Sequence, residues 1–258
     1  MIDKILRRTE RFLHKIKRAI FELRLGKFLK DKSGLEIGGP TPLFANELPL
    51  YKLVESLDGC NFKDSTVWEG KITEGYHYNF YQDKKGYQFI DEASNLKEIQ
   101  SGSYDFLLAS HCLEHCANTL KTMHEWVRVI KPDGIIVLVL PDKQYTFDHK
   151  REVTTFSHLL QDYTNDIDEK DLTHLEEILK LHDLSMDLPA GNLESFKQRS
   201  LSNIENRCLH HHVFDFDLLE SLCKYFKLSV KFKRLIPPYH QVIIAKKDKN
   251  LNNGSAGK

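Results

Sequence analysis

Two apolar runs separated by an amphipathic stretch constrain the fold of this chain more than any other feature. The runs YDFLLASH, residues 104–111, and GIIVLVLPD, residues 134–142, are nearly continuous in apolar residues, as expected of strands buried on both faces. Between them, apolar residues recur at helical spacing, at Leu113, Leu120, Met123, Trp126, Val127 and Ile130. A strand, a helix and a second buried strand form a βαβ unit, so the sequence predicts a parallel sheet.

Five further segments complete the predicted sheet. Three strands precede the βαβ unit, in GLEIGG at 34–39, YKLVESLDG at 51–59 and GYQFIDEA at 86–93. Two strands follow a helix at 214–226, namely LSVKFKRLI at 228–236 and HQVIIAKK at 240–247. Because only PPY joins the last two, they must pair antiparallel. We therefore predict an α/β, Rossmann-like sheet of seven mostly parallel strands with an antiparallel C-terminal hairpin.

The 258 residues divide into three predicted parts. Residues 1–31 form a basic amphipathic helix, because residues 1–30 carry ten Lys/Arg against three Asp/Glu and apolar residues recur every three to five positions. Residues 32–247 form the α/β domain, and 248–258 form a disordered tail. Within the domain, residues 143–212 hold seven of the thirteen histidines and form a helical insertion after the fifth strand, where open α/β sheets bind ligands.

Composition excludes several classes of protein. Apolar residues make up 41% and charged residues 29%, which is typical of a globular domain, and no run of 18 apolar residues could cross a membrane. The N-terminus lacks the apolar core of a signal peptide, and five scattered cysteines are an odd number, so we expect reduced thiols and a cytoplasmic protein. The basic helix either packs on the domain or contacts an anionic surface such as the inner membrane. Zero net charge makes nucleic acid an unlikely partner.

The glycine turn in SGLEIGGPTPLF, residues 33–44, indicates what the sheet binds. Gly38 and Gly39 follow the first strand and let backbone approach a ligand closely. Pro40 and Pro42 have no N–H, so the turn is a poor cradle for a pyrophosphate, which argues against a nicotinamide cofactor. Asp58 follows Gly38 by 20 residues, the spacing of an acid that binds a ribose diol. A ligand with ribose and no phosphate fits better.

These residues, in this order, resemble the class I S-adenosylmethionine (SAM)-dependent methyltransferases. LEIGGP is similar to the family's first motif, FIDEASNL carries its adenine-capping acid, YDFLLASHCLEH is similar to its fourth strand, and EWVRVIKPDGIIVLVLP to the helix and strand that follow. The resemblance covers residues 33–142 and 213–247 and makes 32–247 the methyltransferase domain. It implies SAM as the cofactor, bound by Glu36, Gly38, Gly39, Asp58, Asp91, Ser110 and His111. Glu69 is the alternative to Asp58.

The insertion supplies the candidate catalytic residues. Methyl transfer to a hydroxyl needs a general base, and histidine is suited to that role at neutral pH. We expect His149 to be the base, because it follows the fifth strand closely, with His158 as its alternative and Arg151 as a partner for an anionic group of the substrate. His210, His211 and His212 are further candidates. The histidines, Asp148 and Asp162 could together hold a divalent metal, but no recognisable ligand spacing supports one, so we assign no metal ligands.

The sequence therefore predicts a SAM-dependent methyltransferase that acts on oxygen in a small-molecule or glycan acceptor that is hydroxylated or anionic. The whole pattern resembles methyltransferases of type 11, of the kind found with bacterial surface-polysaccharide assembly. The alternative is a non-catalytic domain of the same fold that binds an anionic partner or RNA through the basic helix. RNA binding would favour aromatic residues interleaved with the basic ones, whereas Phe12, Phe21 and Phe28 lie near the apolar stripe.

Overall fold

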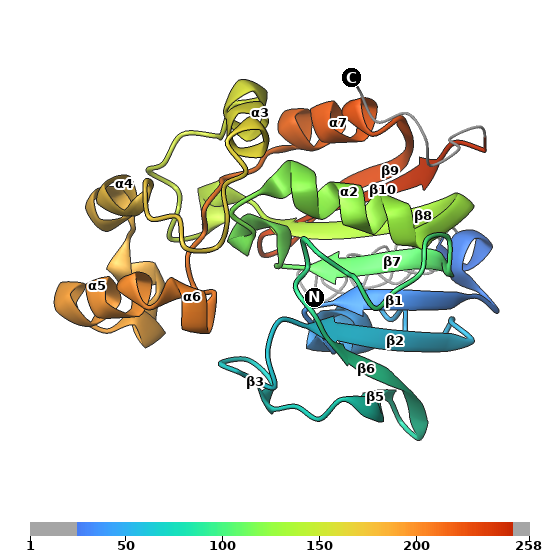
Figure 1. Ribbon diagram of the computed structural model, residues 1–258. Helices are drawn as coiled ribbons and strands as arrows, with labels where there is room; N and C mark the ends of the chain where they lie inside the picture. Colours follow the sequence, from blue (N-terminus) through green and yellow to red (C-terminus); the bar gives the residue numbers. More distant parts are fainter. Residues whose placement is uncertain (1–24, 250–258) are drawn as a thin grey trace, which may run out of the picture.

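Eight strands form one sheet in the order β5-β6-β2-β1-β7-β8-β10-β9 in the computed structural model, which describes residues 25–249 (Figure 1). The strands are β1 (Ser33–Ile37), β2 (Ser56–Asn61), β5 (Gly75–Tyr81), β6 (Lys84–Ile90), β7 (Tyr104–Ser110), β8 (Ile130–Pro141), β9 (Leu228–Ile236) and β10 (His240–Lys247). The five neighbouring strands β6, β2, β1, β7 and β8 are parallel, while β10 pairs antiparallel with both β8 and β9. A separate small hairpin joins β3 (Ser65–Thr66) and β4 (Gly70–Lys71).

Helices follow β7 and β8 in the chain. The α-helices are α2 (Thr119–Val129), α3 (Phe156–Thr164), α4 (Leu175–Leu181), α5 (Leu193–Leu201), α6 (Asn203–Asn206) and α7 (Phe216–Tyr225). Shorter helical turns are η1 (Leu43–Glu47), η2 (Leu113–His115), η3 (Lys143–Tyr145), η4 (Leu184–Met186) and η5 (Leu188–Ala190). No α-helix lies between residues 48 and 112, all of which the structure describes. Hairpins and turns therefore make those connections.

The predicted fold class is confirmed, with one strand more than expected. Seven strands correspond to the predicted ones, including the antiparallel C-terminal pair, and the insertion follows β8. The additional strand is β5, which pairs antiparallel with β6 at the opposite edge. The predicted second strand began too early: residues 51–53 form a turn, and β2 starts at Ser56. Tyr51 of that turn is buried in the core and Leu53 is partly buried against it, so a turn and a strand looked alike in the sequence.

Alternating side chains of the central strands bury two faces of the sheet. Ile136 and Leu138 of β8 pack with α2 and α7 in one core cluster, whereas Val137 and Val139 pack in a second cluster on the other face. This period of two, on strands covered on both sides, explains the continuous apolar runs in the sequence. The second cluster holds residues from before β2 and from the central strands.

The segment before β1 belongs to this second core. Residues 25–29 are helical, and Leu25 and Leu29 are fully buried against the sheet. The last part of the proposed helix thus packs on the sheet, and the boundary at residue 31 stays a prediction. The remainder of the predicted helix at 1–31, like the end of the predicted tail at 248–258, lies outside the described residues. None of the helices described is long and apolar enough to span a membrane.

The later part of the insertion at 143–212 forms a separate layer beyond one end of the sheet. Figure 1 shows α4, α5 and α6 grouped there, apart from α3, which lies beside α2 and α7. A small apolar cluster of Ile178, Ala190, Phe196 and Leu209 holds the outer group together. The insertion thus faces the edge where the parallel strands end.

Candidate active site

A cavity of about 630 Å³ opens at the carboxyl ends of β1, β2, β6 and β7. Its wall on the sheet side includes Gly38, Asn61, Asp91, Ser110 and His111. The β3–β4 hairpin adds Trp68 and Glu69, and the insertion adds Glu169 and Arg207. This size and position are typical of small-molecule sites in open α/β sheets.

The glycine turn after β1 needs glycine at both positions. Gly38 has φ +76°, a conformation that side chains disfavour, and its N–H donates to the carbonyl oxygen of Cys60 at 2.9 Å. At Gly39, a Cβ atom would lie 2.3 Å from the carboxyl carbon of Glu36 and 2.5 Å from the hydroxyl oxygen of Tyr78. The turn therefore sits directly on a buried polar group.

That group is Glu36, and its position corrects its expected role. Its carboxylate accepts hydrogen bonds from the hydroxyls of Tyr51 at 2.8 Å and Tyr78 at 2.5 Å, and from the N–H of Thr41 at 3.3 Å. Burial raises the pKa of Glu36 to about 7, although these hydrogen bonds oppose the shift. Glu36 does not line the cavity; it holds the turn in place through its hydrogen bond with Thr41.

Asp58 also lies elsewhere than expected. It is in the middle of β2, where its carboxylate accepts from the N–H of Tyr87 at 2.7 Å and the hydroxyl of Tyr104 at 2.7 Å. Asn61 instead ends β2 on the cavity wall, and its amide donates to the carbonyl oxygen of Gly39 at 2.9 Å. The predicted strand ended two residues too early, which is why Asn61 was missed. The alternative residue, Glu69, does line the cavity.

The ends of β6 and β7 bring three predicted residues to the cavity wall. Asp91 is buried and accepts from the N–H groups of Glu92 and Glu98, at 3.1 and 3.3 Å, which orders the loop after β6. Ser110 is buried, and its hydroxyl oxygen has no hydrogen-bond partner among the described residues. Its neighbour His111 lies 2.8 Å from a ring nitrogen of His240.

The predicted catalytic residues of the insertion do not reach the cavity. His149 pairs with Asp183 at 2.9 Å, and His158 lies 3.1 Å from a ring nitrogen of His174. Arg151 is 2% exposed and binds Asp148 at 3.0 Å and the carbonyl oxygen of His210 at 2.8 Å. None of the three lines the cavity. The short distance from β8 along the chain did not show which way the His149 side chain points. Arg151 is buried and bonded to other parts of the insertion, so it is not open to a substrate.

His115, in the turn after β7, is the histidine that the structure brings to the cavity together with His111. Its Nδ1–H donates to the carbonyl oxygen of Leu209 at 3.0 Å, which leaves the lone pair on Nε2. Burial, aided by the His210 ring, lowers the pKa of His115 to about 4, so the ring is neutral at pH 7. The motif HCLEH was the signal in the sequence, but the contact with Leu209, 94 residues away, was not visible there.

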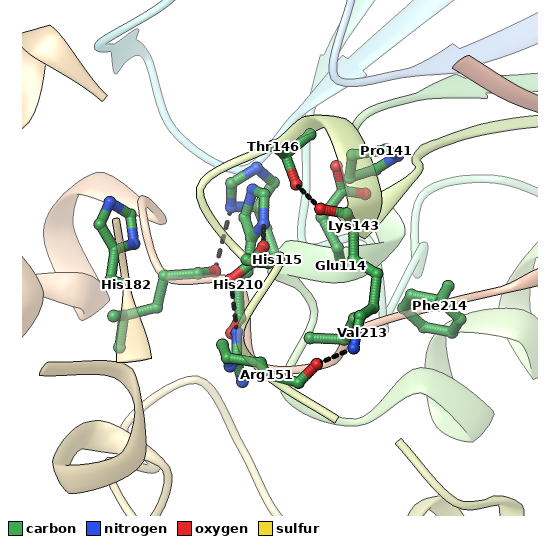
Figure 2. Close-up of polar contacts among 12 residues, drawn as sticks. Glu114, His115, Pro141, Lys143, Thr146, Arg151, His182, His210, Val213 and Phe214 are labelled. Carbon is green, nitrogen blue, oxygen red and sulfur yellow. Dashed lines mark hydrogen bonds and ion pairs between the residues drawn. The ribbon is translucent and has the colours of Figure 1, made fainter. Parts of the chain in front are cut away.

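A buried group of ionisable side chains stands behind His115. Figure 2 shows His115, His210 and Glu114 close together, and the ring centroids of the two histidines are 4.6 Å apart. His210 pairs with Asp148 at 2.5 Å, and this carboxylate raises the pKa of His210 even though burial opposes the shift. Both oxygens of Glu114 are buried without a hydrogen-bond partner in the described part of the chain. Negative charge therefore lies close to any proton that His115 accepts.

The cavity fits a cofactor with ribose and no phosphate. Gly38 brings backbone without a side chain to the cavity, Asn61 and Asp91 provide polar side chains at neighbouring strand ends, and the hydroxyl of Ser110 is unpaired among the described residues. Of the predicted cofactor residues, Gly38, Asp91, Ser110 and His111 line the cavity, whereas Glu36, Gly39 and Asp58 do not.

Comparison with protein-family models matches residues 6–212 to a family described as a methyltransferase domain. A search of curated proteins found no match. Similar solved structures include a SAM-dependent methyltransferase from Methanosarcina mazei, 17% identical, with a TM-score of 0.48 over 86% of this chain and 95% of that one. A second is a putative S-adenosylmethionine-dependent methyltransferase from Listeria monocytogenes, 14% identical, with a TM-score of 0.46 over 89% of this chain and 99% of that one. A third is 1,6-didemethyltoxoflavin-N1-methyltransferase from Burkholderia thailandensis, 11% identical, with a TM-score of 0.46 over 90% of this chain and 76% of that one.

Proposed function

The chain belongs to the methyltransferase-domain family and is a SAM-dependent methyltransferase, and from this premise we propose that it methylates a hydroxyl oxygen of a polar, carbohydrate-type acceptor. When bound, SAM supplies a methyl group on a sulfonium whose sulfur departs as a neutral thioether. The turn at residues 38–42 would hold the methionine part of SAM, Asn61 the ribose, and Asp91 the adenine.

Unpaired polar atoms on the insertion side of the cavity carry the proposal about the acceptor. Nε and Nη1 of Arg207 and one carboxyl oxygen of Glu169 are buried without hydrogen-bond partners among the described residues. Burial raises the pKa of Glu169 to about 7, so this group can donate or accept a hydrogen bond near neutral pH. Buried polar groups without partners are costly, and a ligand rich in hydroxyls or carrying an anionic group would satisfy them.

His115 is suited to take the proton of the acceptor hydroxyl. Its Nε2 makes no hydrogen bond within residues 25–249, and the bond from Nδ1 to Leu209 keeps the ring in the basic tautomer. As the oxygen–methyl bond forms and the methyl–sulfur bond breaks, Nε2 accepts the hydroxyl proton. The neighbouring Glu114 carboxylate stabilises the positive charge that His115 then carries.

An acceptor screen with methyl-labelled SAM tests this proposal. Monosaccharides, oligosaccharides and nucleotide sugars are incubated with the enzyme, and the position of the label is read by NMR. A methyl ether on a hydroxyl is the expected product. Label found on nitrogen, sulfur or carbon would contradict O-methylation, and label accepted only by flat apolar compounds would contradict the polar acceptor. Arg207→Gln should weaken acceptor binding while leaving SAM affinity within about threefold, because Arg207 would serve the acceptor.

We also propose, on the resemblance and the polar cavity wall, that the acceptor belongs to bacterial surface-glycan biosynthesis in the cytoplasm. The ten basic residues among residues 1–30 support a peripheral contact with anionic lipid. Co-sedimentation of the full chain with vesicles containing anionic lipid tests this, because binding should weaken as salt rises. Equal binding to neutral vesicles, or none at low salt, would contradict it.

A further inference from the structure

Three histidines and one aspartate of the insertion converge at a second place, away from the cavity. We call His158, His174, His212 and Asp162 the rear cluster. α3 supplies His158 and Asp162 one helical turn apart, His174 immediately precedes α4, and His212 lies in the segment that leads to α7. Four side chains from three segments thus meet, although no compact motif in the sequence unites them.

Their ligand atoms are spaced as around one metal ion. Nε2 of His158 lies 3.1 Å from Nε2 of His174 and 3.4 Å from Oδ2 of Asp162, which lies 3.5 Å from Nε2 of His212. One ring nitrogen from each histidine lies within 4.8 Å of those of the others. In a tetrahedral zinc site with bonds of about 2.0–2.1 Å, ligand atoms are roughly 3.3 Å apart. The three rings also contact one another edge to face, with centroids 4.9–5.8 Å apart and interplanar angles of 67–80°.

The rear cluster has too few protons for its own hydrogen bonds. Oδ2 of Asp162 and Nδ1 of His212 are buried without partners in the described residues. The hydrogen bond between the Nε2 atoms of His158 and His174 requires that one of these two nitrogens presents a lone pair. A divalent cation at the centre of the cluster would satisfy the unpaired carboxylate oxygen of Asp162. The contact of 3.1 Å between Nε2 of His212 and the carbonyl oxygen of Ala117 would be exchanged for the metal.

We propose that the rear cluster is a structural zinc site with three histidine nitrogens and one aspartate oxygen as ligands. Imidazole and carboxylate at tetrahedral spacing favour zinc over magnesium or calcium, which prefer six or more oxygen ligands. Because protein atoms fill all four positions, none remains for water or substrate, and the ion would stabilise structure. Glu177 lies 3.9 Å from Nδ1 of His174, a separation that one water molecule would bridge, so it would orient this ligand from outside the site.

The site would join three segments of the insertion to one another next to the cavity. The N–H of Ala117, whose neighbour Cys116 lines the cavity, donates to Glu169 of the cavity wall at 3.0 Å. Zinc would therefore join α3, the start of α4 and the segment before α7 behind the wall that carries Glu169. This inference does not depend on which acceptor is methylated.

The test measures zinc directly in the full-length protein. After chelation, zinc affinity is determined by competition with a chromogenic chelator, and bound metal is counted by inductively coupled plasma mass spectrometry. We expect one zinc per chain, with ligation by three nitrogens and one oxygen at about 2.0–2.1 Å in zinc-edge X-ray absorption. His174→Ala and Asp162→Ala should each weaken zinc binding by more than about 100-fold, since the loss of an outer-shell partner alone costs 10- to 100-fold.

Matched controls separate this site from other histidines. His182→Ala removes an insertion histidine that pairs with Asp187, and zinc affinity should not change. Should a ligand variant fail to fold, cobalt loaded into the parent protein replaces it, because tetrahedral cobalt gives intense visible bands that zinc abolishes. Folded parent protein that binds no zinc, or six-coordinate cobalt spectra, would overturn the proposal. Full zinc affinity in Asp162→Ala would contradict the carboxylate as a zinc ligand. A loss of zinc affinity in His182→Ala as large as in the ligand variants would show that zinc binds at another site.

Discussion

The two walls of the cavity are built by different means. On the sheet wall, Gly38, Asn61, Asp91 and Ser110 are placed by strand ends and by hydrogen bonds with backbone groups. On the insertion wall, Arg207 pairs with Glu92, and Glu169 accepts from the N–H of Ala117 and lies 3.9 Å from His211. These contacts join segments that are distant in sequence. The first wall is a product of the sheet itself, whereas the second depends on particular side chains. Each side chain of the insertion wall should therefore matter more for stability.

The largest effect should come from Arg151, the clamp behind the insertion wall. Arg151→Met leaves Asp148 buried with one partner fewer and frees two backbone carbonyls, which should lower the free energy of unfolding by about 3–5 kcal/mol. Chemical denaturation measures it. Lys150→Met, one residue away and half exposed, should change stability by less than about 1 kcal/mol. Similar losses of unfolding free energy in the two variants would show that the insertion wall does not depend on particular buried side chains.

Glu36 is a buried ionisable residue next to the turn of the sheet wall, and it should make the free energy of unfolding depend on pH. Its pKa is about 7 in the folded protein and 4.5 in the unfolded chain, so its contribution is fully present below pH 4.5 and is lost as pH rises through 7. Relative to Glu36→Gln, the parent should lose up to about 3 kcal/mol of unfolding free energy between pH 5 and pH 8. Parallel stability curves for the two proteins would show that Glu36 ionises normally.

His115 tests whether the insertion side supplies chemistry as well as structure. His115→Ala should lower kcat about 100-fold or more with the acceptor found by screening, while the KM for SAM stays within about threefold. His149→Ala, off the cavity, should leave kcat unchanged. Because the pKa of His115 is about 4, the parent rate should not fall between pH 8 and pH 5. A loss with an apparent pKa near 6.5 would instead indicate a different histidine.

The smallest effect should come from the sheet wall, at Asn61. Asn61→Ala removes one polar side chain from the cavity and one bond to Gly39, so affinity for S-adenosylhomocysteine should fall about tenfold. Asp58→Asn should change that affinity by less than about twofold, because Asp58 faces Tyr87 and Tyr104. Isothermal titration calorimetry measures both. The opposite ranking would restore Asp58 as the ribose ligand.

The same contrast explains what the sequence could predict. Strand periodicity and the glycine turn are local, so the sheet, its parallel core and the C-terminal hairpin could be predicted. The resemblance to the methyltransferase family implied Asp91 and Ser110, and both line the cavity. Asp58 was misplaced because a period of two shows which face a residue takes but not where a strand ends. His149 was misplaced because its partner, Asp183, lies 34 residues away and turns it from the cavity. The role of His115 depends on Leu209, at a distance that no local pattern reports.

The β3–β4 hairpin gives the enzyme an optical signal. The chain has two tryptophans, and they occupy opposite surroundings. Trp126 is fully buried with its indole N–H bonded to the carbonyl oxygen of Ala93, whereas Trp68 is 54% exposed on the hairpin, lines the cavity and lies 5.4 Å from the His115 ring. Indole emission shifts with the polarity around the ring, and only Trp68 stands where a ligand changes that polarity. Intrinsic fluorescence of the unlabelled protein should thus follow filling of the cavity through a single residue.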